Sequence, residues 1–252
     1  MNFAKKVIIV TGASSGIGAD AAKHFARLGG KVCLVARNEK LLKSVAEEIQ
    51  QSGSLERPLV IPADVTKDGE RIIGETVNHF GKLDVLINNA GIYQVNSMKN
   101  FSISHLDNVF NTNLRSVAIL TSLAVPHLEK TKGNIVNVSS IAGLKAFTGN
   151  LSYCVSKAAL DQFTKCVALD LAPMGIRVNS INPAMIRTPI LEKAGMSAVE
   201  AAKTFEAGKT MHPIGRIGEP ADTSEAIAYL ASDSASFITG VLLPVDGGYA
   251  AK

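Results

Sequence analysis

The chain has 252 residues, of which 46% are hydrophobic and 19% charged; this composition argues against a disordered or fibrous protein and suits one domain with a sizeable core. The formal net charge of +4 comes from 26 basic and 22 acidic residues that are dispersed along the chain, so it gives no support to nucleic-acid or membrane binding. Three cysteines and five histidines without metal-ligand spacing argue against a disulfide framework and a metal site.

Short apolar segments rich in β-branched residues alternate with segments of helical periodicity. The strands are predicted at 6–11, 31–36, 58–62, 84–88, 133–138, 176–181 and 240–245. The helices are predicted at 16–28, 38–51, 67–80, 104–129, 152–172 and 221–232. Strands that are apolar on both sides and alternate with helices indicate a parallel sheet covered on both faces. The sequence therefore predicts an α/β fold with a Rossmann-like, doubly wound parallel sheet of about seven strands.

No low-complexity linker or repeat divides the chain, so residues 1–252 are expected to form a single domain. Residues 189–213 form an insertion that we expect to act as a substrate lid. Four of its apolar side chains could face the pocket or could instead be subunit contacts: Leu191, Met196, Phe205 and Met211. The opposite wall is expected to include Ile92, Tyr93, Leu144 and Phe147. No apolar stretch has the length of a signal peptide core or a membrane span, so a cytoplasmic protein is the default expectation.

A glycine-rich loop, Thr11-Gly12-Ala13-Ser14-Ser15-Gly16-Ile17-Gly18, lies between the first predicted strand and the first predicted helix. Glycines allow a close approach of the backbone to a phosphate, which the free N–H groups of the helix N-terminus can bind. The spacing differs from the common G-x-G-x-x-G pattern, and glycine can also end a strand for purely structural reasons. The position of the loop favours a dinucleotide site formed by Gly12, Ser14, Ser15, Gly16, Ile17 and Gly18.

The residues after the second predicted strand bear on the type of dinucleotide. NAD sites usually place Asp or Glu there, whereas this chain has Ala36-Arg37-Asn38. Arg37 can bind a 2′-phosphate through a charge-assisted contact, although a solvated arginine at a strand end is also common. We therefore expect NADP(H), bound in part by Arg37 and Asn38, with NAD(H) as the weaker alternative. Asp64-Val65 is positioned to contact the adenine, while Asp64 could equally cap the next helix.

Tyr153 and Lys157 are spaced i, i+4 on a predicted helix, so their side chains share one face. An ammonium about 4 Å from a phenol contributes on the order of 4 kcal/mol at an effective dielectric of 20, enough to lower the phenol pKa by about three units. Such a phenol can exchange a proton with an alcohol oxygen. The pair alone is weak evidence, because long helices contain it by chance. Ser140, at the end of the preceding strand, could enter the same site.

Together these motifs resemble, in order and spacing, the short single-domain members of the short-chain dehydrogenase/reductase superfamily, from Thr11-Gly12 to Asp246-Gly247-Gly248. The resemblance implies that Tyr153 is the acid/base, that Ser140 polarises the substrate carbonyl, and that Lys157 holds the nicotinamide ribose and lowers the tyrosine pKa. It implies that Asn113 anchors a water of a proton relay. It also implies that Tyr153, Lys157 and six further residues contact the cofactor: Asn89, Ala90, Gly91, Pro183, Ile186 and Thr188.

One departure from the family pattern is Asn182-Pro183-Ala184, where the family usually has Pro-Gly. Alanine adopts a positive φ less freely than glycine, so the backbone beside the nicotinamide is expected to differ slightly. His212, near the lid, is either a pocket residue or a structural one. Cys166 and Cys33 are expected to be small core residues.

The resemblance implies an oxidoreductase that transfers a hydride between NADP(H) and a carbonyl or secondary alcohol. The apolar lid favours a lipophilic substrate, such as a ketone, a steroid-like compound or a 3-ketoacyl thioester, although a mixed substrate is also compatible. The alternatives are a non-catalytic NADP(H)-binding sensor or scaffold, and a sugar-nucleotide epimerase or dehydratase, which typically has a larger C-terminal domain. A small-molecule substrate and a homo-oligomer, either a tetramer or a dimer, are the partners implied.

Overall fold

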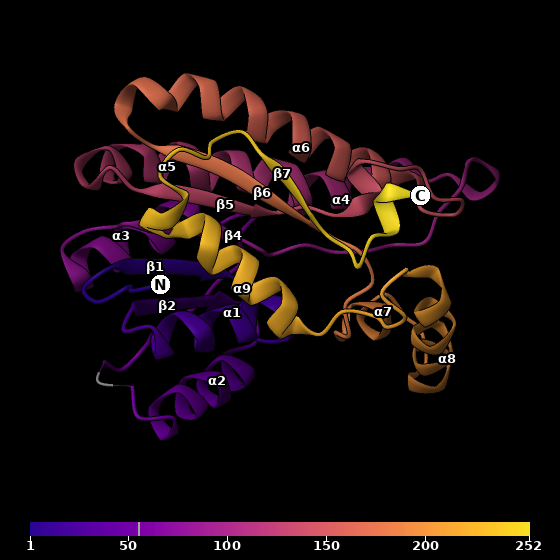
Figure 1. The fold of residues 1–252 in the computed structure, drawn as a ribbon, viewed down its shortest axis with the longest axis horizontal. Helices are drawn as coiled ribbons and strands as arrows, with labels where there is room; N and C mark the ends of the chain where they lie inside the picture. The colour runs from indigo at the N-terminus through magenta and orange to yellow at the C-terminus, as the bar shows by residue number, and fades with distance from the viewer. Residues whose placement is uncertain (55) are drawn as a thin grey trace.

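The β-branched segments form seven strands in the computed structural model of the chain, which describes residues 1–54 and 56–252. They are β1 (Val7–Thr11), β2 (Lys31–Ala36), β3 (Leu59–Pro62), β4 (Val85–Asn88), β5 (Asn134–Val138), β6 (Arg177–Pro183) and β7 (Leu242–Val245). All pair in parallel in the order β3-β2-β1-β4-β5-β6-β7 (Figure 1). The predicted fold is confirmed. The strand order reverses between β1 and β4, and ligands of such sheets bind at the carboxyl ends of the strands there.

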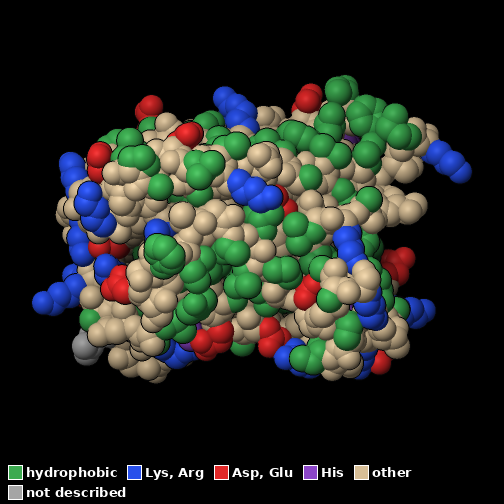
Figure 2. Space-filling model, turned by 45° about the horizontal axis from the view of Figure 1, so that its top comes forward, with side chains coloured by type: hydrophobic (Ala, Val, Ile, Leu, Met, Phe, Trp, Pro, Cys, Tyr) green, Lys and Arg blue, Asp and Glu red, His purple; other side chains and the backbone are tan. Residues whose placement is uncertain are grey.

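Helices cover both faces of the sheet (Figure 1). One apolar core joins the sheet to α1 (Gly16–Arg27), α2 (Glu39–Gln51) and α9 (Pro220–Ala231). The other joins it to α3 (Gly69–Phe80), α5 (Ser116–Thr131) and α6 (Leu151–Leu171). Alternate residues of β1 contribute to opposite cores, as the two-residue period of a strand requires. On the face drawn in Figure 2, basic and acidic side chains are interspersed.

The predicted helix 104–129 is interrupted in the structure. It consists of α4 (Ile103–Phe110), a π-helical turn at Asn111–Arg115, and α5. A π turn inserts an extra residue without changing the apolar character of the sequence, so periodicity does not reveal it. Cys166 is also a correction: it is exposed on α6 and is not a core residue, whereas Cys33 is buried as expected.

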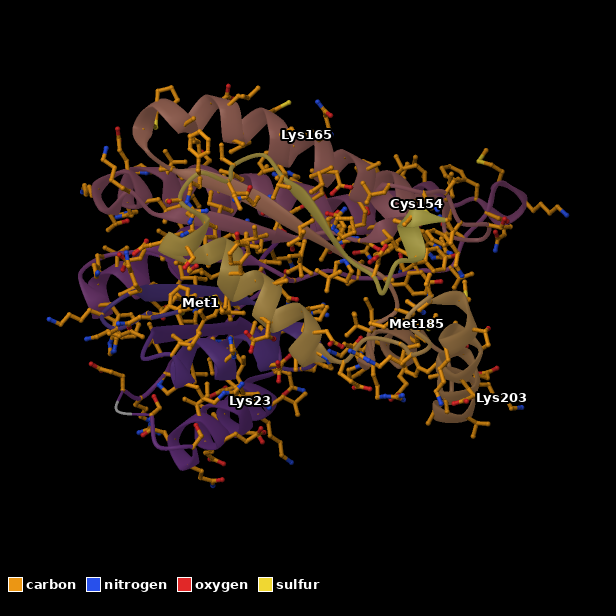
Figure 3. The ribbon with its side chains drawn as sticks, viewed as in Figure 1. Met1, Lys23, Cys154, Lys165, Met185 and Lys203 are labelled. Carbon is orange, nitrogen blue, oxygen red and sulfur yellow. The ribbon has the colours of Figure 1, made fainter. Side chains whose placement is uncertain are left out.

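The lid contains two helices that periodicity did not predict, α7 (Ile190–Lys193) and α8 (Ala198–Gly208). Ser197 and Glu200 form a capping box at the start of α8, and this S-x-x-E pattern was a readable signal for the helix. In Figure 3, Met185 lies where the lid leaves the body of the molecule, while Lys203 projects from α8 into solvent. On α8, Ala201 and Phe205 are buried whereas Lys203 is exposed, so the lid has an apolar inner side and a solvated outer side.

Among the described residues, no helix combines the length and apolar character needed to cross a bilayer. Within the same residues, no group of three or more histidine, cysteine or acidic side chains could hold a metal ion.

Candidate functional site

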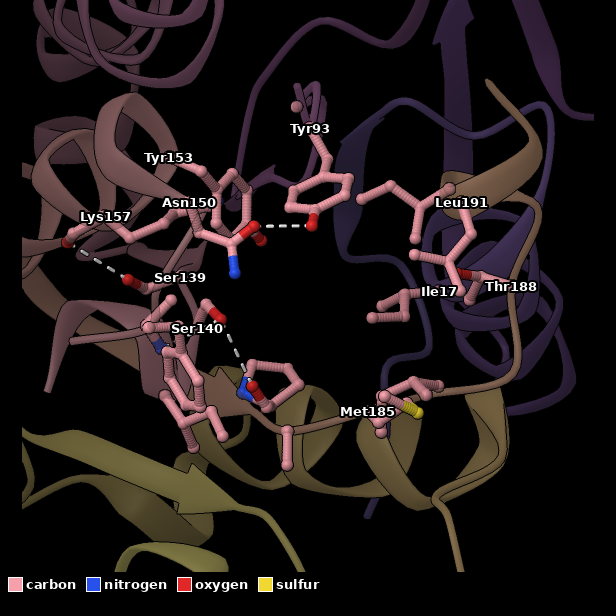
Figure 4. Close-up of a pocket in the computed structure, with 18 of the residues that line it drawn as sticks. Ile17, Tyr93, Ser139, Ser140, Asn150, Tyr153, Lys157, Met185, Thr188 and Leu191 are labelled. Atoms are coloured by element: carbon pink, nitrogen blue, oxygen red, sulfur yellow. Dashed lines mark hydrogen bonds between the residues drawn. The ribbon is translucent and has the colours of Figure 1, made fainter. Parts of the chain in front are cut away.

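A cavity of about 410 Å³ lies at the carboxyl ends of the central strands, beneath the lid (Figure 4). This volume is within the range of small-molecule sites. Tyr153, Ser140 and Lys157 line one side, while Ile17 and Leu191 lie across the opening. The cavity thus joins the end of the glycine loop, the carboxyl end of β5, the first turns of α6 and the lid.

The glycine loop has a shape that only glycine permits. Gly12 and Gly16 have φ angles of +67° and +56°. A Cβ on Gly18 would lie 2.4 Å from Asn89 Nδ2 and 2.5 Å from the carbonyl oxygen of Gly12. Asn89 itself is fixed because its side-chain nitrogen donates to the carbonyl of Thr11 at 2.8 Å. The loop is therefore a close-packed backbone cradle at the start of α1, which fits a dinucleotide phosphate.

Two cationic side chains lie near this cradle. Lys193, on the lid helix α7, donates from Nζ to Ser15 Oγ at 2.6 Å. Burial lowers the pKa of Lys193, and the positive charge of Arg37 lowers it further. Arg37 is exposed at the end of β2. The two cations are thus close enough to repel one another, and an anion between them would be stabilised by both.

Two polar residues expected at the cofactor are engaged with the protein. Asn38 caps α2, accepting from the amide of Leu41 at 3.0 Å through Oδ1. Asp64 Oδ1 accepts from the amide and the hydroxyl of Thr66 at 3.0 and 2.8 Å. Although burial raises the pKa of Asp64, these bonds and the nearby Arg37 give a net lowering. Asp64 therefore organises the turn that follows β3, and contact of either residue with a dinucleotide stays a prediction.

Tyr153 and Lys157 lie on one face of α6 and both line the cavity. Lys157 Nζ donates to the carbonyl of Val138 at 2.8 Å and lies 5.7 Å from the centre of the Tyr153 ring. Burial raises the pKa of Tyr153 to about 12, with a hydrogen bond to Ser140 acting in the opposite direction. Burial lowers the pKa of Lys157 to about 8, which the Asp161 carboxylate partly opposes.

This arrangement differs from the expectation that the ammonium would bring the phenol close to working pH. Burial penalises the charged forms of both side chains, and it is the largest cause of both pKa shifts. The tyrosine is consequently a protonated acid at neutral pH. The same burial makes Lys157 a lysine that releases its proton near pH 8.

Ser140 is held in place by its surroundings. Its Oγ accepts from the amide of Ala142 at 3.1 Å. Its carbonyl accepts from Asn182 Nδ2 at 3.0 Å, and the same nitrogen lies 2.9 Å from the buried carboxylate of Asp161. Asn182 thereby links the end of β6 to α6 and to Ser140. This link holds Ser140 in position relative to Tyr153, which lies on α6.

Asn113 lies in the π turn and is 1% exposed. Its Nδ2 donates to the carbonyl of Ile92 at 3.0 Å and to Ser156 Oγ at 3.1 Å, and its Oδ1 accepts from the amide of Ile92 at 2.8 Å. Both amide hydrogens are thus used to hold the loop after β4 against α6. The expected role of Asn113 in a proton relay stays a prediction.

The structure brings nine of the twenty predicted site residues to one cavity. They are Ile17, Asn89, Gly91, Ser140, Tyr153, Lys157, Pro183, Ile186 and Thr188. Gly12 and Ser15 lie in the adjoining loop. Gly16 abuts the start of the lid, since a Cβ there would lie 2.9 Å from Thr188 Cγ2 and 3.8 Å from Pro189 Cδ. Ala184 needs no positive φ, because among the described non-glycine residues only Lys5 and Lys132 have one.

The predicted substrate walls are found in part. All four lid residues line the cavity, as do Tyr93 and Phe147, whereas Leu144 is 40% exposed and does not. Ile92 does not line it either. His212, left open by the sequence, also lines it. Several lining residues were not predicted from the sequence: Asn150, Met185, Ile190 and Tyr249. Asn150 could have been predicted, because it lies three residues before Tyr153.

Comparison with known proteins identifies relatives of the whole chain. Residues 12–250 match the profile of a family described as enoyl-(acyl carrier protein) reductase. The L-fucose dehydrogenase of Rattus norvegicus is 36% identical over 98% of this chain and 90% of its own length. The cyclopentanol dehydrogenase of Comamonas sp. is 38% identical over 98% of each chain. A short-chain dehydrogenase/reductase of unknown function from Caenorhabditis elegans, solved with its cofactor, superposes with a TM-score of 0.94 at 37% identity, covering 99% of this chain and 96% of its own.

Proposed function

The chain belongs to the short-chain dehydrogenase/reductase superfamily, and on that premise we propose that it transfers a hydride between NADP(H) and a carbonyl or secondary alcohol. The observation that carries the proposal is the convergence of Tyr153, Ser140 and Lys157 on one cavity that adjoins the glycine loop. Its relatives are named as dehydrogenases of alcohols, which supports the reaction class. The NADP preference, the site residues and the substrate are our own inferences.

The preference for NADP(H) over NAD(H) is supported by charge. No carboxylate occupies positions 36–38, where it would accept from the ribose hydroxyls of NAD and repel a phosphate. Arg37 is exposed there, and Lys193 reaches the neighbouring Ser15 from the lid. Two cations that repel each other without a ligand gain a common partner in a phosphate, and an arginine can bind it through two parallel hydrogen bonds.

Residues of this chain donate the proton and the hydrogen bond that the reacting oxygen of the substrate needs. The bound dinucleotide supplies or accepts the hydride. The hydroxyl of Tyr153, protonated at neutral pH because its pKa is raised to about 12, donates its proton to the substrate oxygen during reduction. Ser140, fixed by Ala142 and Asn182, donates a hydrogen bond to the same oxygen. Lys157 supplies the proton that restores Tyr153.

The proposed substrate is lipophilic or mixed, because apolar side chains dominate the lid side of the cavity: Met185, Ile190, Leu191, Met196, Phe205 and Met211. The relatives named above include a dehydrogenase of a sugar, L-fucose, and a dehydrogenase of a cyclic alcohol, cyclopentanol. Both of these compounds form rings with secondary hydroxyls. A ketone on a ring or a lipophilic chain would place its carbonyl at Tyr153 and its hydrocarbon part beneath the lid.

We also propose a homo-oligomer in the cytoplasm. Apolar side chains are exposed on the outer side of α6 and beside the final strand, where Leu169 is 76% exposed and Phe237 is fully exposed. Burial of these side chains against a second copy would remove them from water.

The dependence of reduction on pH follows from the two buried groups. Tyr153 stays protonated throughout the neutral range, whereas Lys157 loses its proton above its pKa of about 8. Because Lys157 acts after the proton transfer, by restoring Tyr153, we expect kcat for ketone reduction to be level below that pKa and to fall by up to about tenfold per pH unit above it. Initial-rate measurements across the pH range test this, and an undiminished rate well above pH 8 would contradict the role given to Lys157.

The function is tested by measuring NADPH oxidation with a panel of cyclic and linear ketones. We expect at least one lipophilic ketone to be reduced, with NADPH preferred to NADH. The competing function is a sensor or scaffold that binds the dinucleotide without turnover. Tight NADPH binding with no reduction of any ketone would favour that alternative.

A further inference from the structure

Asn150 occupies a position where asparagine normally has a structural task that it does not perform here. It is the N-cap residue of α6, yet its side chain accepts no hydrogen bond from the first turn of that helix. An N-cap asparagine usually accepts such a bond and stabilises the helix. Instead, Asn150 Oδ1 accepts from the hydroxyl of Tyr93 at 2.5 Å. The carboxamide is therefore oriented by Tyr93 and not by the helix.

This orientation presents a hydrogen-bond donor to the cavity. In Figure 4 the amide nitrogen of Asn150 points into the open space between Tyr153 and the lid. Its only protein partner among the described residues is the carbonyl of Thr148 at a long 3.4 Å. An amide nitrogen carries two hydrogens, so at least one is free for a ligand.

The donor lies beside the reacting group. Asn150 immediately precedes the first turn of α6, Tyr153 lies in that turn, and both residues line the cavity. The Tyr93 ring packs edge-on against the Tyr153 ring, with 5.3 Å between their centres. The position of the Asn150 amide is thus tied to that of the catalytic phenol through Tyr93.

A second polar atom of the same cavity lacks a protein partner. His212 Nδ1 lies 2.7 Å from the carbonyl of Gly208, and because a carbonyl only accepts, Nδ1 carries the hydrogen. Nε2 is buried and has no hydrogen-bond partner in the described part of the chain. An unsatisfied buried nitrogen is costly unless a ligand or water satisfies it. The cavity therefore has polar groups beyond those that the hydride transfer uses.

We propose that Asn150 and Tyr93 form a second polar subsite, which binds a hydroxyl on the carbon next to the reacting carbon. The substrates it selects are ring compounds with vicinal oxygens: cyclic vicinal diols in the oxidative direction and α-hydroxyketones in the reductive one. This inference rests on the proposed function and narrows its substrate class. The Asn150 amide donates to the second oxygen, the Tyr93 hydroxyl fixes the amide, and the apolar lid residues cover the ring.

The subsite is tested with two alcohols that differ by one hydroxyl, cyclohexanol and cis-cyclohexane-1,2-diol, each oxidised with NADP⁺. For the unaltered enzyme we expect kcat/KM to be about tenfold higher for the diol, the contribution of one hydrogen bond. Asn150→Ala should reduce this ratio to near one, chiefly by raising KM for the diol. Tyr93→Phe, which frees the amide to rotate, should give an intermediate ratio. Asn108→Ala, at an exposed asparagine of α4, is the matched control and should keep the original ratio.

The outcomes separate the subsite from the function on which it rests. If Asn150 and Tyr93 serve only to hold the loop after β4, both variants will melt at lower temperature while the diol-to-alcohol ratio keeps its original value, and the subsite is overturned. Equal efficiency of the unaltered enzyme on both alcohols, with oxidation that depends on Tyr153, also overturns the subsite and leaves the proposed function standing. Absence of Tyr153-dependent oxidation of either alcohol overturns both.

Discussion

Tyr153→Phe is expected to lower kcat for ketone reduction by about a hundredfold to ten-thousandfold, the usual contribution of a positioned general acid. The substitution removes only the hydroxyl that donates the proton, while the ring can still pack edge-on against Tyr93. The glycine loop is untouched, so NADPH should still bind and raise the melting temperature. Initial rates of NADPH oxidation and thermal unfolding with and without NADPH measure the two effects.

A matched control for this substitution is Tyr229→Phe, which removes the same hydroxyl from a tyrosine of α9 that is 40% exposed. Its rates should equal those of the unaltered enzyme. If Tyr153→Phe kept nearly full activity, the proton would have to come from another group, and the assignment of Tyr153 as the acid would be wrong.

Arg37→Glu is expected to reverse the cofactor preference. A hydrogen bond to a charged group contributes roughly 1.5–3 kcal/mol, which corresponds to a loss of about tenfold to a hundredfold in NADPH affinity. The new carboxylate would also repel the 2′-phosphate and could accept from the ribose hydroxyls of NADH, so NADH affinity should rise. Fluorescence titration of each dinucleotide gives the two dissociation constants.

Arg57→Glu makes the same change of charge at an exposed arginine before β3 and controls for the effect of net charge. It should leave the ratio of the two affinities unchanged. A preference of the unaltered enzyme for NADH, or an equal loss of both dinucleotides in Arg37→Glu, would contradict a 2′-phosphate contact at Arg37.

The sheet was predictable because its strands carry their own signal. The apolar residues of β1 and β2 are buried from both faces of the sheet, so each strand reads as a continuous apolar segment, and the glycine loop marks the end of the first. The i, i+4 spacing of Tyr153 and Lys157 was sufficient to predict that they share one face of a helix. The local sequence pattern was sufficient to predict a feature wherever that feature depends on a single helix or strand.

Features that depend on several elements were not predictable in this way. The π turn around Asn113 results from contacts with Ile92 and Ser156, which are distant in sequence. The pKa values of Tyr153 and Lys157 depend on burial and on the neighbouring Ser140 and Asp161, and spacing on a helix contains neither. Helix α8 is a different case, because its capping box was present in the sequence and was overlooked in a polar segment.

The most direct test of hydride transfer is to follow an isotope label from the cofactor into the product. NADPH carrying deuterium on the reactive face of the nicotinamide C4 is incubated with the enzyme and a ketone that it reduces, and the alcohol is analysed by mass spectrometry. We predict one deuterium on the carbinol carbon of each product molecule, and at least a hundredfold less labelled product when Tyr153→Phe replaces the enzyme at the same reaction time. Unlabelled product from cofactor labelled on either face, or cofactor that binds without being consumed, would contradict hydride transfer by this protein.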